Sequence, residues 1–287
     1  MNAPAKEPLR ILAANPSPLT GPGTTTFLIG QRHVAVIDPG PDDDAHLEAI
    51  LQAARGRISH ILVTHAHLDH SAGAARLSRM AGAPVLAFGD ATAGRSPIMT
   101  RLAAGGLVGG GEGLDAGFAP DMLLADGDVV ETPDWTLRAL HTPGHFGGHL
   151  GFQWDKTIFC GDLVMAWSST LISPPDGDLA DYLRSVERLA GLSPNRLLPT
   201  HGAAIEAPLP RLHDLIAHRR TRSAQILAAL RQQPDTAQGL ARRIYDVHPR
   251  LLVAAERNVL AHLIALAQLG VVDFEGDLSA VTIFAPA

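Results

Sequence analysis

The segment Thr64-His65-Ala66-His67-Leu68-Asp69-His70 holds three histidines and one aspartate within six positions. The apolar run 58–63 before it predicts a buried strand, and a helix is expected to begin near Ser71. The segment is therefore a turn between a core strand and a helix. A polar loop in which histidines cluster by chance is the alternative. Four ligand-type side chains directly after a core strand argue against it.

The spacing within this segment predicts two metal positions. Alternate residues of an extended turn point to the same side, so His65 and His67 can chelate one ion together. Asp69 and His70, at the start of the next helix, are displaced toward a second position. Gly73 removes a side chain where backbone passes close.

One cluster cannot complete two coordination spheres, because each ion binds about four or five ligands. Further candidates follow predicted strands at three later points in the chain, namely His145, Asp162 and His201. One rim of a sheet can present such strand-end residues together. The single cysteine, Cys160, excludes a disulfide framework and a cysteine-based zinc site.

Short strands and helices alternate over the first 160 residues, and the pattern turns helical from Asp178. Strands are expected at 24–29, 33–37, 58–63, 84–88, 135–140, 157–160 and 196–198, and helices at 44–54, 73–80, 179–189, 210–232, 236–245 and 252–269. A hairpin is expected at 271–284. Three helices followed by a hairpin is a winged-helix order. We therefore expect an α/β catalytic domain at 1–208 and a winged-helix-like domain at 209–287.

Charge is unevenly distributed between these two modules. Residues 211–270 carry nine Arg and four acidic residues, within a chain whose net charge is -6. Basic surface can bind nucleic acid. A solvated helical face is the favoured interpretation of the basic positions Arg219, Arg220, Arg222, Arg242 and Arg243.

The segment 105–121 contains seven glycines and is too broken for regular structure. A loop over the site and an ordinary solvent loop are equally compatible with it. No signal peptide is evident at the N-terminus, and no run reaches the ~18 apolar residues that a membrane helix needs. A cytoplasmic protein without membrane association is the expectation.

The motifs, in order and spacing, resemble the metallo-β-lactamase superfamily. They are His65-x-His67-x-Asp69-His70, the His145 turn, Gly161-Asp162 and Thr200-His201-Gly202. The resemblance covers residues 10–205 and implies a four-layer αβ/βα sandwich with the metals at one edge. It implies that His65, His67 and His145 hold one metal, that Asp69, His70 and His201 hold the other, and that Asp162 bridges them.

The opening Asn15-Pro16-Ser17-Pro18 with Gly21-x-Gly23-Thr24, together with the helical tail, is similar to the beta-lactamase-like protein 2 group. Its studied members include a single-strand-specific endoribonuclease. Two departures concern substrate contacts, since neither involves an expected ligand. Residues 25–27 read Thr-Thr-Phe where the group commonly has Asn-Thr-Tyr, and Thr200 stands where Gly is usual.

These assignments predict a metal-dependent hydrolase. Two divalent cations would lower the pKa of a bridging water toward ~7 and so supply a hydroxide at neutral pH. Asp69 is expected to orient this nucleophile as a catalytic residue. Zinc suits the ligand set, while manganese and iron stay open.

A small ester, thioester, lactone or amide is the favoured substrate, because a chain with only two Lys is poorly equipped for a long polyanion. The alternative is a single-strand-specific endoribonuclease with RNA as substrate, and a non-enzymatic DNA-binding module is a third class. A homodimer is left open. His141, His149 and Asp38 are candidates for supporting the ligands, with simple turn roles as the alternative.

Overall fold

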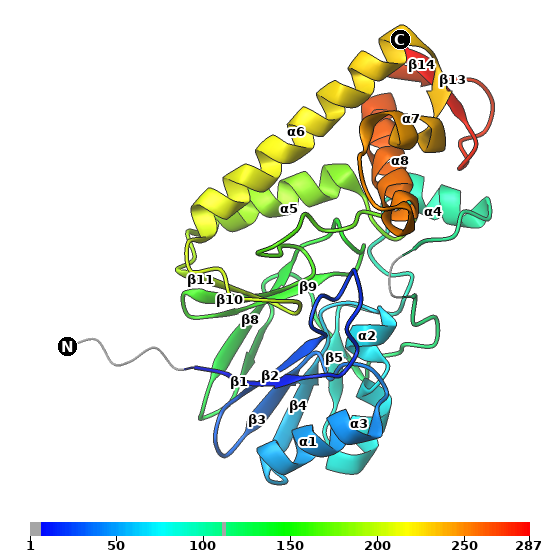
Figure 1. Ribbon diagram of the computed structural model, residues 1–287. Coiled ribbons are helices and arrows are strands. Elements are labelled where there is room, and N and C mark those ends of the chain that lie inside the picture. Colours follow the sequence, from blue (N-terminus) through cyan, green and yellow to red (C-terminus); the bar gives the residue numbers. More distant parts are fainter. Residues whose placement is uncertain (1–6, 111–112) are drawn as a thin grey trace.

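The computed structural model describes residues 7–110 and 113–287. Two β-sheets face each other in the N-terminal domain (Figure 1). The first sheet has the order β1-β2-β3-β4-β5-β6 and the second β11-β10-β9-β8-β7. Their bounds are β1 (Leu9–Leu12), β2 (Thr25–Ile29), β3 (Val34–Ile37), β4 (Ile58–Leu62), β5 (Val85–Ala87), β6 (Met122–Leu123), β7 (Val129–Glu131), β8 (Thr136–His141), β9 (Leu150–Trp154), β10 (Thr157–Gly161) and β11 (Arg196–Pro199).

Strand direction determines where the predicted ligand residues lie. In the first sheet β3, β4 and β5 run parallel, and in the second β10 runs parallel to β11. Parallel strands bring their carboxyl ends to one edge of a sheet. The residues that follow β3, β4, β10 and β11 are therefore collected along one rim of the sandwich.

Helices cover the outer face of each sheet (Figure 1). Helices α1 (Asp44–Ala54) and α3 (Ala74–Ala81) pack on the first sheet through residues such as Leu47 and Leu77. Helix α5 (Leu179–Leu192) packs on the second through Tyr182, Val186 and Leu189. A third apolar cluster, including Phe27 and Phe159, fills the space between the sheets. The expected four-layer αβ/βα sandwich is confirmed.

Side-chain caps determine where the two longer covering helices begin. The carboxylate of Asp43 accepts from the backbone N–H of His46 at the start of α1, and that of Asp178 accepts from Ala180 at the start of α5. Such caps satisfy backbone donors that have no partner within the helix. The short helix α2 (Leu68–Ser71) lies between β4 and α3.

The C-terminal part is a winged helix, as expected. Its helices are α6 (Pro208–Gln232), α7 (Ala237–Ile244) and α8 (Leu252–Gln268), with a 3₁₀ turn η1 (Pro249–Leu251) before α8. The predicted hairpin is present as β13 (Val272–Phe274) paired with β14 (Ile283–Pro286). A further short strand, β12 (Asp235–Thr236), pairs with the other side of β14.

Helix α6 belongs to two cores. Its first half contributes Leu212, Leu215 and Ile216 to the cluster beneath α5, whereas Ile226 and Leu230 belong to the C-terminal core. The helix α4 (Pro97–Ala104) of the N-terminal domain also packs into the C-terminal core. The expected boundary at residues 208 and 209 stays a prediction; it coincides with the start of α6.

Several elements were not predicted, among them β1, β9 and α4. Part of the glycine-rich segment 105–121 lies against the histidine-rich segment 64–70: the backbone N–H of Leu68 donates to Gly113 O and that of Asp115 to Ala66 O. Residues 111–112 of that segment lie outside the described residues. Among the described helices, none has the length and apolar character needed to cross a membrane.

Candidate metal centre

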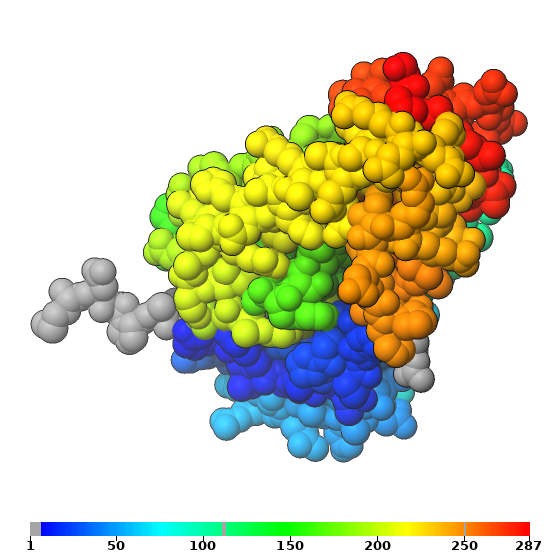
Figure 2. All heavy atoms as spheres, turned by 45° about the horizontal axis from the view of Figure 1, so that its top comes forward, coloured from blue at the N-terminus to red at the C-terminus, as the bar shows by residue number. Residues whose placement is uncertain are grey.

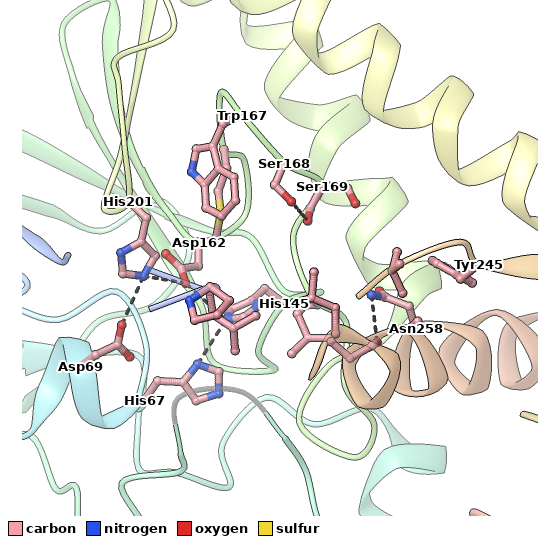
Figure 3. Close-up of a pocket in the computed structure, with 18 residues that line it drawn as sticks. His67, Asp69, His145, Asp162, Trp167, Ser168, Ser169, His201, Tyr245 and Asn258 are labelled. Atoms are coloured by element: carbon pink, nitrogen blue, oxygen red, sulfur yellow. Dashed lines mark hydrogen bonds and ion pairs between the residues drawn. The ribbon is translucent and has the colours of Figure 1, made fainter. Parts of the chain in front are cut away.

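All seven predicted ligand side chains are buried and converge at the rim of the sandwich. His65, His67, Asp69 and His70 follow β4, as the sequence indicated. His145 lies in the turn between β8 and β9, Asp162 follows β10, and His201 follows β11. Figure 3 shows five of the seven, His67, Asp69, His145, Asp162 and His201, around one end of a cavity.

Three imidazoles form the first group of facing ligand atoms. His67 Nδ1 lies 2.9 Å from His65 Nε2 and 3.1 Å from His145 Nε2. Three nitrogen atoms directed at a common point match the ligand type and number of one face of a tetrahedral metal site.

The second group combines carboxylates with imidazoles. His201 Nε2 lies 3.2 Å from Asp69 Oδ2 and 3.3 Å from Asp162 Oδ2. His70 Nε2 lies 3.4 Å and 3.5 Å from the same two oxygens. Asp162 Oδ2 is also 3.8 Å from His145 Nε2 of the first group. The Asp162 carboxylate therefore lies between the two groups, in agreement with its predicted bridging position.

The opposite ring nitrogen of each of four imidazoles is held by an oxygen. Nδ1 of His145 lies 2.7 Å from Leu171 O, that of His201 3.2 Å from Gly23 O, and that of His65 3.0 Å from Thr64 Oγ1. Nδ1 of His70 lies 2.9 Å from Asp38 Oδ2. Oxygen acceptors on Nδ1 fix the tautomer that leaves Nε2 free to ligate.

Asp38 supports the site from beneath. Its carboxylate accepts from the backbone N–H of Thr64 (2.7 Å), from the Thr64 hydroxyl (2.8 Å) and from the Thr200 hydroxyl (3.0 Å), besides contacting His70. At this departure from the group pattern the Thr200 hydroxyl donates to Asp38, which a glycine could not do. Asp38 is completely buried and has φ +52°, so it is both a turn residue and the ligand support suggested by the sequence.

Three buried polar atoms of the predicted ligands lack a hydrogen-bond partner within the described part of the chain. They are Asp69 Oδ1, Asp162 Oδ1 and His70 Nε2. Buried polar atoms are rarely left unpaired, because desolvation without a partner costs free energy. Carboxylate oxygens and an imidazole nitrogen are ligand atoms for divalent cations. The residues present therefore fit a metal centre.

Electrostatics divide the centre in two. Burial lowers the pKa of His67 to about 3 and also lowers the pKa values of His65 and His145, so these imidazoles are neutral. Burial also acts to lower the pKa of His70 and His201. The negative charges of the Asp69 and Asp162 carboxylates have a larger effect than burial, so both pKa values are raised, that of His201 to about 10. The carboxylate half therefore stabilises positive charge.

Neighbouring residues complete the support. His149 Nε2 accepts from the backbone N–H of Asp162 (3.3 Å), while its Nδ1 lies 2.9 Å from Thr142 Oγ1. His149 is thus a supporting residue. His141 lies farther out, stacked on Phe88 with its Nε2 2.9 Å from Gly147 O.

Asn15 and Thr24 connect the N-terminal motif to the centre. The Asn15 amide donates to Thr24 Oγ1 (2.9 Å), and that hydroxyl donates to Asp69 Oδ2 (3.2 Å). The N-terminal motif was predicted as part of the family pattern, but this contact with Asp69 was not.

The solvated-face prediction is wrong for Arg219. Its side chain is buried, donates to Thr170 O and, at 3.0 Å, to Asn258 Oδ1, and lies over the Tyr182 ring. Thr170 Oγ1 in turn donates to the backbone oxygen of Asp162 at 2.5 Å. Arg219 therefore connects α6 to the loop that carries a predicted ligand.

A cavity of about 220 Å³ opens at the centre. Its polar floor consists of His67, Asp69, His145, Asp162 and His201. Its C-terminal wall consists of Tyr245, Val247, Leu251, Ala254, Ala255 and Asn258. Sequence reasoning identified every residue of the floor and none of the wall.

Family comparisons agree with this geometry. Residues 19–201 match the metallo-beta-lactamase superfamily, and residues 236–280 match the beta-lactamase associated winged helix domain. The chain belongs to the metallo-beta-lactamase superfamily. The superfamily fold is that of metal-dependent hydrolases that bind divalent metals, and the chain is an enzyme of this class.

Relatives extend the match over both domains. A beta-lactamase-like protein 2 homolog of Drosophila melanogaster is 30% identical over 91% of this chain and 88% of its own length. An atrochrysone carboxyl ACP thioesterase of Aspergillus fumigatus is 28% identical over 77% of this chain and 64% of its own length. The resemblance to the beta-lactamase-like protein 2 group is thereby confirmed.

Solved structures show the same fold for this superfamily member. A metallo-beta-lactamase family protein from Thermus thermophilus superposes with a TM-score of 0.76 at 24% identity, covering 98% of each chain. A protein crystallised in a di-iron-bound form matches 70% of this chain and 96% of its own, with a TM-score of 0.53 and 26% identity.

Proposed function

We propose that the enzyme hydrolyses a small carboxylic ester, thioester, lactone or amide at a centre of two divalent cations. The observation that carries this proposal is the cavity beside the seven converging ligands. Among the described residues that line it, none is Lys or Arg. A substrate with several phosphates would need such cations.

His65, His67 and His145 would hold one metal, and Asp69, His70 and His201 the other, with Asp162 shared. Zinc suits imidazole and carboxylate ligands, and iron is the metal named for one structural neighbour. When bound, two such cations lower the pKa of a water and stabilise negative charge that develops on oxygen.

We assign Asp69 a catalytic role besides ligation. Its Oδ2 is fixed by Thr24 Oγ1 and lies 3.2 Å from His201 Nε2, while its Oδ1 has no partner among the described residues. Asp69 also lines the cavity. A carboxylate oxygen in that position can accept a proton of an attacking water and so orient it.

The name of the Aspergillus relative supports a thioester within the proposed substrate class, since that protein is named as a thioesterase. The alternative, a single-strand-specific endoribonuclease, rests on the group to which the chain is similar. The guanidinium groups near the cavity already have other partners: Arg211 donates to Met165 O and Ser168 O, and Arg222 lies over Tyr245.

Metal analysis with a substrate panel tests the proposal. Purified protein is expected to contain two equivalents of divalent metal and to cleave neutral esters or thioesters at rates that change little with salt. Cleavage of single-stranded RNA that falls steeply between low and moderate salt, without ester or thioester cleavage, would replace the proposal by the nuclease alternative.

A further inference from the structure

The C-terminal domain supplies one side of the catalytic cavity. The wall residues come from α8, η1 and the segment after α7. In Figure 2 this part of the chain, drawn in orange, lies beside the green segment that follows β10 and against the dark blue N-terminal segment. The winged helix is therefore part of the active-site enclosure.

Apolar side chains make up most of the lining beyond the polar floor, together with the polar residues Ser168, Ser169 and Asn258. Leu19, Met165 and Trp167 of the catalytic domain line the same cavity as the C-terminal wall. The indole of Trp167 is half-exposed and lies against Gly202, where an added Cβ would come within 2.8 Å of the ring. Apolar surface of this kind favours an apolar substrate group over water.

We infer that the substrate carries an apolar acyl group that lies against the C-terminal wall, with Ala254 limiting its length; this inference rests on the proposed function. The acyl group is the part that esters, thioesters, lactones and amides share. The cavity of about 220 Å³ is about seven times the ~30 Å³ that one water molecule occupies in the liquid, which leaves room for an acyl chain of medium length.

Neighbouring residues on α8 provide a matched pair of test positions. Ala254 lines the cavity and is half-buried. Val253 does not line it and is 65% exposed. An added phenyl ring at Ala254 therefore fills acyl space, whereas the same ring at Val253 extends into solvent.

The principal experiment measures kcat/KM of the metal-loaded enzyme on thioesters from acetyl to decanoyl. We expect kcat/KM to rise by up to about fourfold per methylene until roughly eight carbons, as burial of each methylene predicts. In a second series of acetyl thioesters, lengthening the thiol should leave kcat/KM nearly constant. Steeper dependence on thiol length than on acyl length would overturn the assignment of the wall to the acyl group.

Ala254→Phe is expected to lower kcat/KM at least tenfold more for octanoyl substrates than for acetyl substrates. Val253→Phe should match wild type throughout. Because Ala254→Phe can disturb folding, Leu251→Ala provides an independent variant whose enlarged cavity should move the optimum to longer chains. Unchanged chain-length profiles in both cavity variants would contradict the inference.

A binding measurement separates acyl recognition from turnover. Titration of 1-octanol should change the tryptophan fluorescence of wild-type enzyme, because Trp167 lines the cavity. The change should disappear in Trp167→Phe and require at least tenfold more octanol in Ala254→Phe. Octanol binding that is equal in Ala254→Phe and Val253→Phe would overturn the inference.

The two proposals fail differently. A flat acyl profile with clear thioester hydrolysis would refute the acyl wall and leave the proposed function intact. Loss of the proposed function would instead appear as no hydrolysis of any ester, thioester, lactone or amide by metal-loaded enzyme.

Discussion

The polar floor and the C-terminal wall of the cavity are built in opposite ways. Each floor residue follows a strand end or lies in a tight turn, and hydrogen bonds from its own domain orient four of the imidazoles of the centre. The wall consists mostly of small or apolar side chains, with Asn258 as a polar member, and it comes from another domain. Reaction chemistry is thus encoded locally, whereas the shape of the substrate space depends on domain packing.

The largest effect is expected from a substitution that alters the polar floor and leaves the C-terminal wall intact. Asp162→Asn should lower turnover by about 10³-fold or more and reduce the bound metal, because it removes the shared carboxylate and several kcal/mol of charge stabilisation. Metal content and kcat are measured together. Asp155→Asn, at an exposed turn position with φ +55°, is the control. Two metals and normal turnover in Asp162→Asn would disprove the bridging role.

Asp69→Ala addresses the catalytic part of the floor. We expect kcat to fall by about 10²-fold, which is typical when a group that handles the proton of the nucleophile is lost. Near wild-type kcat with metal still bound would refute this role. Dependence on acyl length should be unaffected, since the C-terminal wall is intact.

Asp38→Asn tests support of the floor from beneath. Asparagine tolerates the left-handed backbone conformation at this position, so the change removes charge without backbone strain. Metal affinity should fall by about 10- to 100-fold, as for other residues that orient ligands. Competition with a chelator measures it, and Asp42→Asn, at an exposed side chain, should behave as wild type.

Arg219→Met tests whether the two regions are coupled. Thr170 O would lose its buried donor, so we expect about 1–3 kcal/mol of lost stability and weaker metal binding through the Asp162 loop. Denaturant unfolding and metal titration measure the two effects. Arg220→Met, whose side chain is 73% exposed, should stay within about 0.5 kcal/mol of wild type. Equal behaviour of both variants would mean that floor and wall are independent.

The smallest effect is expected from Thr200→Gly, which restores the residue common in the group. Loss of the Thr200 hydroxyl bond to Asp38 should cost about 1 kcal/mol of stability. Thr200→Ser keeps a hydroxyl and should recover most of it in thermal unfolding. A more stable Thr200→Gly protein would show that this bond is not a net stabilising contact.

These differences explain what the sequence could predict. His65, His67, Asp69 and His70 were recognisable because their spacing and strand context lie within one segment. The alternation of strands and helices in the sequence predicted an α/β domain. β9 was missed because Gly151 interrupts a short run, and α4 because its few apolar residues face the distant C-terminal core.

Arg219 and the C-terminal wall could not be predicted for a related reason. An amphipathic pattern shows that a helix has two faces, but it does not show whether the polar one meets water or another domain. Tyr245 and Ala254 carry no chemical signature of their own. Their role depends on where α8 lies relative to residues almost a hundred positions earlier.

The continuity of α6 through both cores has a practical consequence for chimeric enzymes. A graft of a foreign winged helix at position 208 would replace Leu212 and Ile216. Both side chains belong to the apolar cluster between the second sheet and its covering helices. A junction between Ile216 and Ile226 would leave each hydrophobic interior with its native half of the helix. Transplanting substrate preference between relatives is therefore best done by splicing within the helix, not at the domain border.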